Sequence, residues 1–110
     1  MELAFETQGL RRVCESDVEA RKRFSGGTAG QLQDRLADMR AAASVSDLVA
    51  GSPSLDEQPP GWIRFGLEGG YELVCAGNHP RPPITDDGRV DFSRVRRVKV
   101  VRIGQESQHG

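Results

Sequence analysis

The residues best suited to chemistry in this chain are basic and lie close to its C-terminus. Five of the nine residues from 94 to 102 are basic and none is acidic, although the formal net charge of the whole chain is only -1. These five are Arg94, Arg96, Arg97, Lys99 and Arg102. A basic cluster in an otherwise acidic chain is typical of a surface that binds a polyanion. His109 follows it, and an imidazole near such a surface is a candidate proton-transfer group.

Other roles stay open for these residues. Charged side chains on an edge strand prevent that strand from pairing with another chain, so the basic run could be a solvated strand face. It could also contact an acidic segment of a protein partner. Arg64 either joins the basic cluster or is a surface arginine, and His109 is either a general acid or base or a residue of a frayed terminus. His79, which precedes a proline in a long loop, is better explained as a turn residue than as a catalytic one.

Length and composition limit the class of protein. With 110 residues, 36% of them hydrophobic and 28% charged, the chain is expected to be one soluble domain over 1–110. We find no secretory signal and no apolar window long enough for a membrane span. Cys14 and Cys75 lack metal-ligand spacing, so we expect reduced core cysteines in a cytoplasmic protein. The absence of metal, nucleotide-loop and nucleophile-elbow motifs predicts no metal and no cofactor.

The first half of the chain has mainly helical periodicity. Residues 1–6 alternate between apolar and polar types and predict a short strand. Residues 8–24 and then 28–43 carry apolar side chains at steps of three and four, which predicts two amphipathic helices in a hairpin. We expect 44–60 to be a linker with one helical turn at 46–50, because prolines do not suit a ladder position.

The second half is expected to be β-structure. Residues 62–67 and 71–76 flank Gly69-Gly70, a dipeptide suited to a tight hairpin turn. A long polar loop over 77–89 precedes the basic strand, which we expect to begin at Ser93. Apolar and basic side chains lie on both faces of that strand, so alternation does not give its register, and either a bulge or burial of both faces would explain the pattern.

The predicted order is β-α-α-β-β-β, which defines an α+β fold with the helical hairpin packed on a mainly antiparallel sheet. The other face of the sheet is left for function, and we expect the tail over 104–110 to be flexible.

Several short segments, taken in their order and spacing, carry a family resemblance over nearly the whole chain. They are Leu36–Ala42, Ser44–Leu48, Pro59–Gly61, Gly70–Val74, Asp87–Val95, Val98–Ile103 and His109–Gly110. The chain thereby resembles the RelE/HigB-type toxins of bacterial type II toxin–antitoxin systems, within the plasmid maintenance killer branch of the RelE/ParE superfamily.

The resemblance implies a microbial RNase-like fold and metal-free cleavage of mRNA on the ribosome. Such cleavage requires a base for the 2′-hydroxyl, cations for the phosphorane and an acid for the leaving oxygen. We expect His109, Arg97 and Arg64 to be catalytic, and the five basic residues of 94–102 to bind RNA. The implied partner is a helix-turn-helix antitoxin, through which the complex binds operator DNA.

Two residues depart from the family pattern. Glu72 stands where the family has an arginine, and Gln108 where it has a tyrosine. Glu72 would repel RNA or pair with a neighbouring arginine. These departures support an alternative, in which the chain is a non-nuclease toxin of ParE type that inhibits DNA gyrase, or a degenerate toxin that only binds its antitoxin in an autoregulatory complex.

Overall fold

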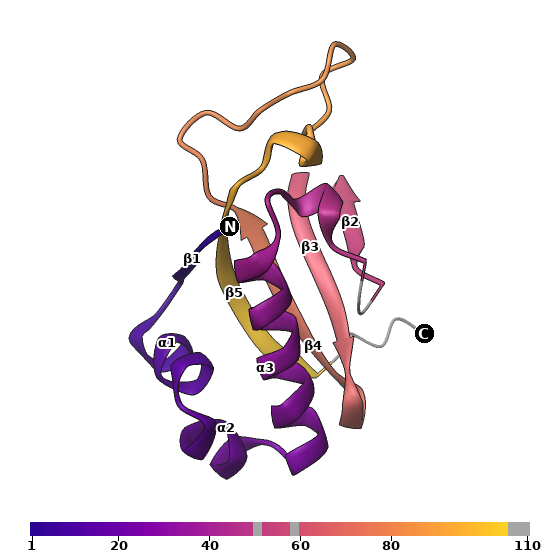
Figure 1. Ribbon diagram of the computed structural model, residues 1–110. Coiled ribbons are helices and arrows are strands. Elements are labelled where there is room, and N and C mark those ends of the chain that lie inside the picture. The colour runs from indigo at the N-terminus through magenta and orange to yellow at the C-terminus, as the bar shows by residue number, and fades with distance from the viewer. Residues whose placement is uncertain (50–51, 58–59, 106–110) are drawn as a thin grey trace.

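The computed structural model describes residues 1–49, 52–57 and 60–105, which form three helices and a five-stranded sheet. Figure 1 shows the longest helix lying across one face of the sheet. In chain order the helices and strands are β1 (Glu2–Phe5), α1 (Gln8–Glu15), α2 (Asp17–Arg23), α3 (Gly26–Ala41), β2 (Ser54–Glu57), β3 (Pro60–Leu67), β4 (Tyr71–Gly77) and β5 (Arg97–Gln105).

The sheet has the strand order β1-β5-β4-β3-β2. β1 runs parallel to β5, and the other three pairs are antiparallel. The α+β class and the mainly antiparallel sheet are therefore confirmed. β5 lies between β1 and β4, so the first and last strands of the described chain are adjacent (Figure 1).

The single helix expected over 8–24 is wrong, because two helices meet at Ser16. This residue is extended (φ −126°, ψ 114°) and ends α1, while its side chain accepts a hydrogen bond from the Glu19 amide and caps α2. A serine that caps a helix satisfies an amide that would otherwise lack a partner. Val18, which the pattern placed on the apolar face, is 64% exposed.

The linker predicted over 44–60 is only partly correct. A short 3-10 turn is present at Val45–Asp47, but Ser54–Glu57 forms β2, an edge strand that pairs with β3. Prolines did not exclude this strand because Pro53 precedes it and Pro60 begins the next one, positions that strands tolerate.

The basic strand begins at Arg97 rather than at Ser93. Residues Phe92–Arg94 form a 3-10 turn, which leaves Arg94 and Arg96 outside the sheet. The register of β5 shifts where Val74 pairs with Arg102 and Cys75 with Val100. This irregularity confirms a bulge in the basic strand, which changes the face to which the later side chains point.

The core lies between α3 and one face of the sheet. Leu32, Leu36 and Met39 of α3 are fully buried, as are Ile63 of β3 and Leu73 of β4. The apolar residues of α3 recur at intervals of three and four and therefore lie on one side of the helix. The apolar residues of each strand recur at intervals of two and therefore lie on the sheet face that meets the helix. No helix of the described chain covers the opposite face (Figure 1).

The truncation Leu36→Ala should destabilise the fold, because it removes fully buried methyl groups and leaves a cavity. We expect a loss of about 2–5 kcal/mol in the free energy of unfolding, measured with urea. Asp34→Ala, an exposed position on the same helix, should change it by less than about 0.5 kcal/mol. Equal losses for the two variants would contradict this placement of the core.

Both cysteines are buried, as expected, and burial raises the pKa of the Cys14 thiol to about 11 and that of Cys75 further still. Because the thiolate is the reactive form, the native protein at pH 8 should react with a thiol reagent about a hundredfold more slowly than the urea-unfolded chain. Equal labelling rates in the native and unfolded chain would show that the thiols are accessible.

The folded state holds the two thiol protons more tightly than the unfolded chain does, so the free energy of unfolding should fall as the pH rises above about 9.

Candidate functional site on the open sheet face

The candidate site is the sheet face that α3 leaves uncovered, which we call the open face. Alternate residues of a strand point to opposite faces, so the neighbours of the core residues lie on this side. Its described members include Glu2, Ala4, Ser54, Asp56, Trp62, Arg64, Glu72, Val74, Ala76, Arg97, Lys99 and Arg102. Of the residues expected to act on RNA, Arg64, Arg97, Lys99 and Arg102 are thus brought to one surface.

The centre of the open face is an ion-pair network around Glu72. Its Oε1 atom accepts a hydrogen bond from Arg102 Nη2 at 2.6 Å and from Arg64 Nη1 at 3.2 Å. Arg64 Nε also donates to Asp56 Oδ2 at 2.6 Å, and this bond raises the pKa of Arg64. The Glu72 side chain is only 11% exposed. The two arginines are therefore neutralised by two carboxylates of the same protein.

This network also covers an apolar residue. Val74 lies on the open face, yet its exposed fraction is 0% and it is separate from the main core. It is paired in register with Arg64 on one side and Arg102 on the other. Arginine stems commonly cover apolar surface, and Glu72 holds both guanidinium groups together above the sheet. Arg64, Glu72 and Arg102 thus have a structural role.

The outer ion pairs are different in kind. Arg97 pairs with Glu2 at 3.1 Å and Lys99 with Glu6 at 2.7 Å. Arg97 and Glu2 are 54% and 77% exposed, and Lys99 and Glu6 are 35% and 48% exposed. Such pairs contribute only about 0–1 kcal/mol, so a phosphate could displace either carboxylate at small cost.

Arg94 and Arg96 lie outside the strands of the open face, and Arg96 lines a hollow beside the 3-10 turn at Val45–Asp47. Arg94 donates to Asp91 and to the carbonyl of Ile84, so its guanidinium holds the long loop together. The hydrogen bonds from Ser93 and Arg94 keep the pKa of Asp91 below its usual value. Arg96 has no carboxylate partner among the described residues, and its side chain remains a candidate for contact with an anion.

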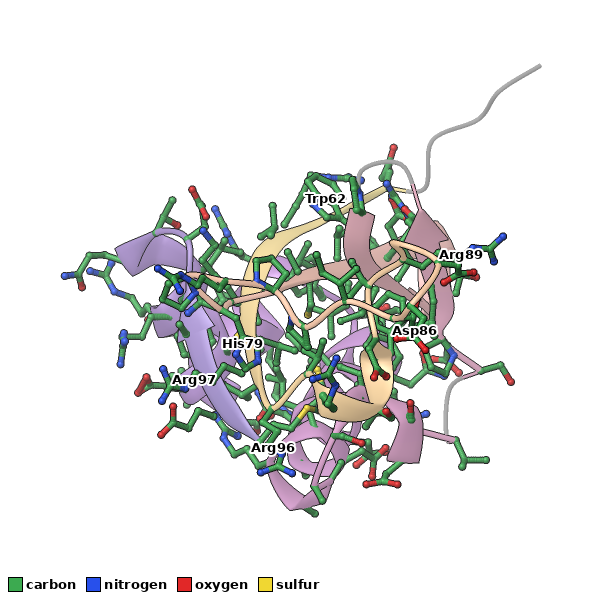
Figure 2. The ribbon with its side chains drawn as sticks, turned by 90° about the horizontal axis from the view of Figure 1, so that it is seen from above. Trp62, His79, Asp86, Arg89, Arg96 and Arg97 are labelled. Atoms are coloured by element: carbon green, nitrogen blue, oxygen red, sulfur yellow. The ribbon has the colours of Figure 1, made fainter. Side chains whose placement is uncertain are left out.

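His79 ties the long loop to the start of β5. Its Nε2 accepts a hydrogen bond from the Arg96 amide at 3.0 Å, which requires an unprotonated Nε2. Figure 2 shows His79, Arg96 and Arg97 at one side of the molecule, away from Asp86 and Arg89 at the other end of the loop. This arrangement agrees with His79 as a residue that holds the loop.

His109 and Gln108 lie outside the described residues. The last described residue, Gln105, pairs with Tyr71, and its neighbour Gly104 pairs with Glu72. β5 therefore ends at the edge of the ion-pair network. The open-face residues described above include no histidine and no tyrosine, so they offer no imidazole or phenol as a general acid or base.

Sequence reasoning missed Trp62, Asp56 and Val74 as members of this surface. Alternation contained the signal for Trp62, because Ile63 and Phe65 point to the core and the residues between them must point outward. Asp56 could not be found in the same way, since its strand had been taken for a linker.

In the described part of the chain, no other group of side chains is better suited to catalysis or ligand binding than the open face. Within these residues no group of three histidine, cysteine or acidic side chains could hold a metal ion. A hollow of about 590 Å³ lies between the start of β3 and the long loop, beside Asp56 of the open-face network, and its lining includes Leu55, Val90 and Phe92. No helix in the described part of the chain has the length and apolar character needed to cross a membrane.

Comparison with protein-family models, curated proteins and solved structures finds no match for this chain.

Replacement of Glu72 should test the structural role of the network. Glu72→Ala leaves Arg102 without its carboxylate and weakens the cover over Val74, so we expect a loss of about 1–3 kcal/mol in the free energy of unfolding. Glu2→Ala, which breaks an exposed pair of similar length, should cost less than about 1 kcal/mol. Urea unfolding of both variants decides the point, and equal stabilities would argue against a structural network.

Proposed function

We propose that this chain is the toxin component of a type II toxin–antitoxin system and that it binds RNA through the open face of its sheet. The observation that carries the proposal is the convergence of Arg64, Arg97, Lys99 and Arg102 on that one uncovered face. The element order, with a strand and helices before an antiparallel sheet, agrees with the fold that the family resemblance implies.

Binding through the open face is supported by the exchangeable outer pairs. Arg97 and Lys99 hold exposed carboxylates that a phosphate can replace. Arginine and lysine pair well with phosphate oxygens. The inner arginines remain bound to Glu72 and Asp56, and they shape the surface on which RNA lies.

Cleavage is less well supported than binding. Metal-free cleavage requires proton transfer to and from the RNA, and the two inner carboxylates are held by arginines. The second candidate function is a ribosome-dependent endoribonuclease. It is favoured because β5 ends beside the ion-pair network at Gln105, four residues before His109 in the sequence. In that case His109 would be the general acid or base, and Arg97 and Arg64 would stabilise the phosphorane.

The proposed partners follow from the toxin class. A helix-turn-helix antitoxin would neutralise the toxin by direct contact and would bring the complex to operator DNA. If the protein does not cleave RNA, it could inhibit DNA gyrase or serve only as the antitoxin's partner in an autoregulatory complex. Growth assays and transcript mapping distinguish these alternatives.

Induced expression without antitoxin should arrest growth. The double variant Arg97→Gln with Lys99→Gln should bind RNA about tenfold more weakly and relieve the arrest, because it removes two phosphate contacts. The matched control is Arg21→Gln with Lys22→Gln, which removes two exposed, ion-paired cations from α2. Normal growth of cells that express the wild-type chain would count against a toxin.

Transcript mapping by primer extension separates the modes of action. Arrest with intact transcripts supports binding without cleavage, provided that no DNA-damage response accompanies it. Cuts at defined codons that disappear in His109→Ala would establish the nuclease instead. A DNA-damage response with intact transcripts would identify gyrase as the target.

A further inference from the structure

One row of side chains crosses the open face from β2 to β1. The strand registers place Asp56, Trp62, Ala76, Lys99 and Ala4 side by side in that order. The small side chain of Ala76 lies between an aromatic ring and an ammonium group, and it is only partly buried. The row therefore has a low point at Ala76 with a flat apolar wall on one side and a cation on the other.

The indole of Trp62 is held in place by its neighbour. The guanidinium carbon of Arg64 lies 5.5 Å from the centre of the ring, a cation–π contact. Arg64 is itself fixed by hydrogen bonds to Asp56 and Glu72. Figure 2 shows Trp62 at the outer side of the molecule, away from the helices. The ring is thus pre-oriented on a surface that no described helix covers.

No other described aromatic side chain is available on this face. Tyr71 points to the helix side, where its ring meets that of Phe24 edge-on at 5.0 Å. Phe65 is buried, and Phe5 and Phe92 pack against the core. A planar ligand that lies on the open face therefore has one stacking partner in the described chain, which is Trp62.

We infer that Trp62, Ala76 and Lys99 form a subsite for one nucleotide of single-stranded RNA. The base stacks on the indole above Ala76, and a neighbouring phosphate displaces Glu6 from Lys99. Adjacent strands are about 4.8 Å apart, so the indole and the lysine are about 10 Å apart at the backbone, a span suited to a base and its phosphate. Only an unpaired base can reach such a ring, which excludes duplex RNA. This inference rests on the proposed function and names the substrate of the same face.

Trp62 is the single tryptophan of the chain, so its fluorescence reports directly on the subsite. The full-length chain is titrated at low salt with a single-stranded uridine hexanucleotide and with an abasic hexamer of the same backbone. We expect saturable quenching by the hexanucleotide and about tenfold weaker binding of the abasic hexamer, because stacking is lost while the phosphates stay. Equal affinities for the two oligomers, or no saturable binding, would overturn the subsite.

Variants measured with a dye-labelled hexanucleotide by anisotropy complete the test. Trp62→Ala should weaken binding about tenfold, and Trp62→Phe should restore much of the loss because it keeps a ring. Lys99→Gln should weaken binding and should lower the slope of log affinity against log salt concentration by about one, the value for one phosphate contact. Lys22→Gln, the control on α2, should change neither quantity. If Trp62→Ala binds as tightly as the wild type, the subsite is wrong.

The outcome can be separated from that of the proposed function. Growth arrest that persists unchanged in Trp62→Ala, together with equal binding of the abasic hexamer, would leave the toxin proposal standing and reject the subsite. Binding that depends on Trp62 in a chain that does not arrest growth would support the subsite and reject the toxin. Circular dichroism shows whether each variant is folded before it is compared.

Discussion

The carboxylate of Glu72 lies between the guanidinium groups of Arg64 and Arg102, and much of the open face depends on this contact. It joins β3, β4 and β5 on the side that lacks helices, where no apolar layer would otherwise hold the side chains in place. It also keeps two long arginines over Val74, which shields that residue from water. A half-buried charge is tolerated only when it is paired, so each member of the network requires the others. The carboxylate at position 72 thus fixes the two arginines to the sheet.

The periodic parts of the fold could be predicted from the sequence. Leu32, Leu36 and Met39 gave the core face of α3, and Ile63, Phe65 and Leu67 gave that of β3. The break at Ser16 was missed because both short helices keep their apolar residues at helical spacing across it. β2 was missed because the prolines around it were taken as disruptive, although they only flank the strand.

The alternative that Glu72 pairs with a neighbouring arginine is confirmed, but the sequence did not show which arginines it binds. Arg64 and Arg102 are far apart in sequence, and only the strand register brings both to Glu72. The bulge in β5 decides which face Arg102 occupies, and a residue pattern with basic and apolar types on both faces could not locate it. Charge counts alone also suggested a strongly basic surface, whereas acidic side chains from β1, β2 and β4 neutralise it. The division into inner fixed pairs and outer exchangeable pairs follows from burial, which the sequence does not specify.

The position of β5 has a consequence for how the protein matures. This strand is made late in synthesis, yet it lies between β1 and β4, so β1 cannot join the sheet before β5 is available. Contacts between residues so distant in sequence form slowly, because the intervening chain must first be ordered. Arg97, Lys99 and Arg102 all belong to this strand, and their carboxylate partners Glu2, Glu6 and Glu72 come earlier in the chain. Until β5 has entered the sheet, these cations and carboxylates are not held together, so the charged surface is among the last parts of the fold to form.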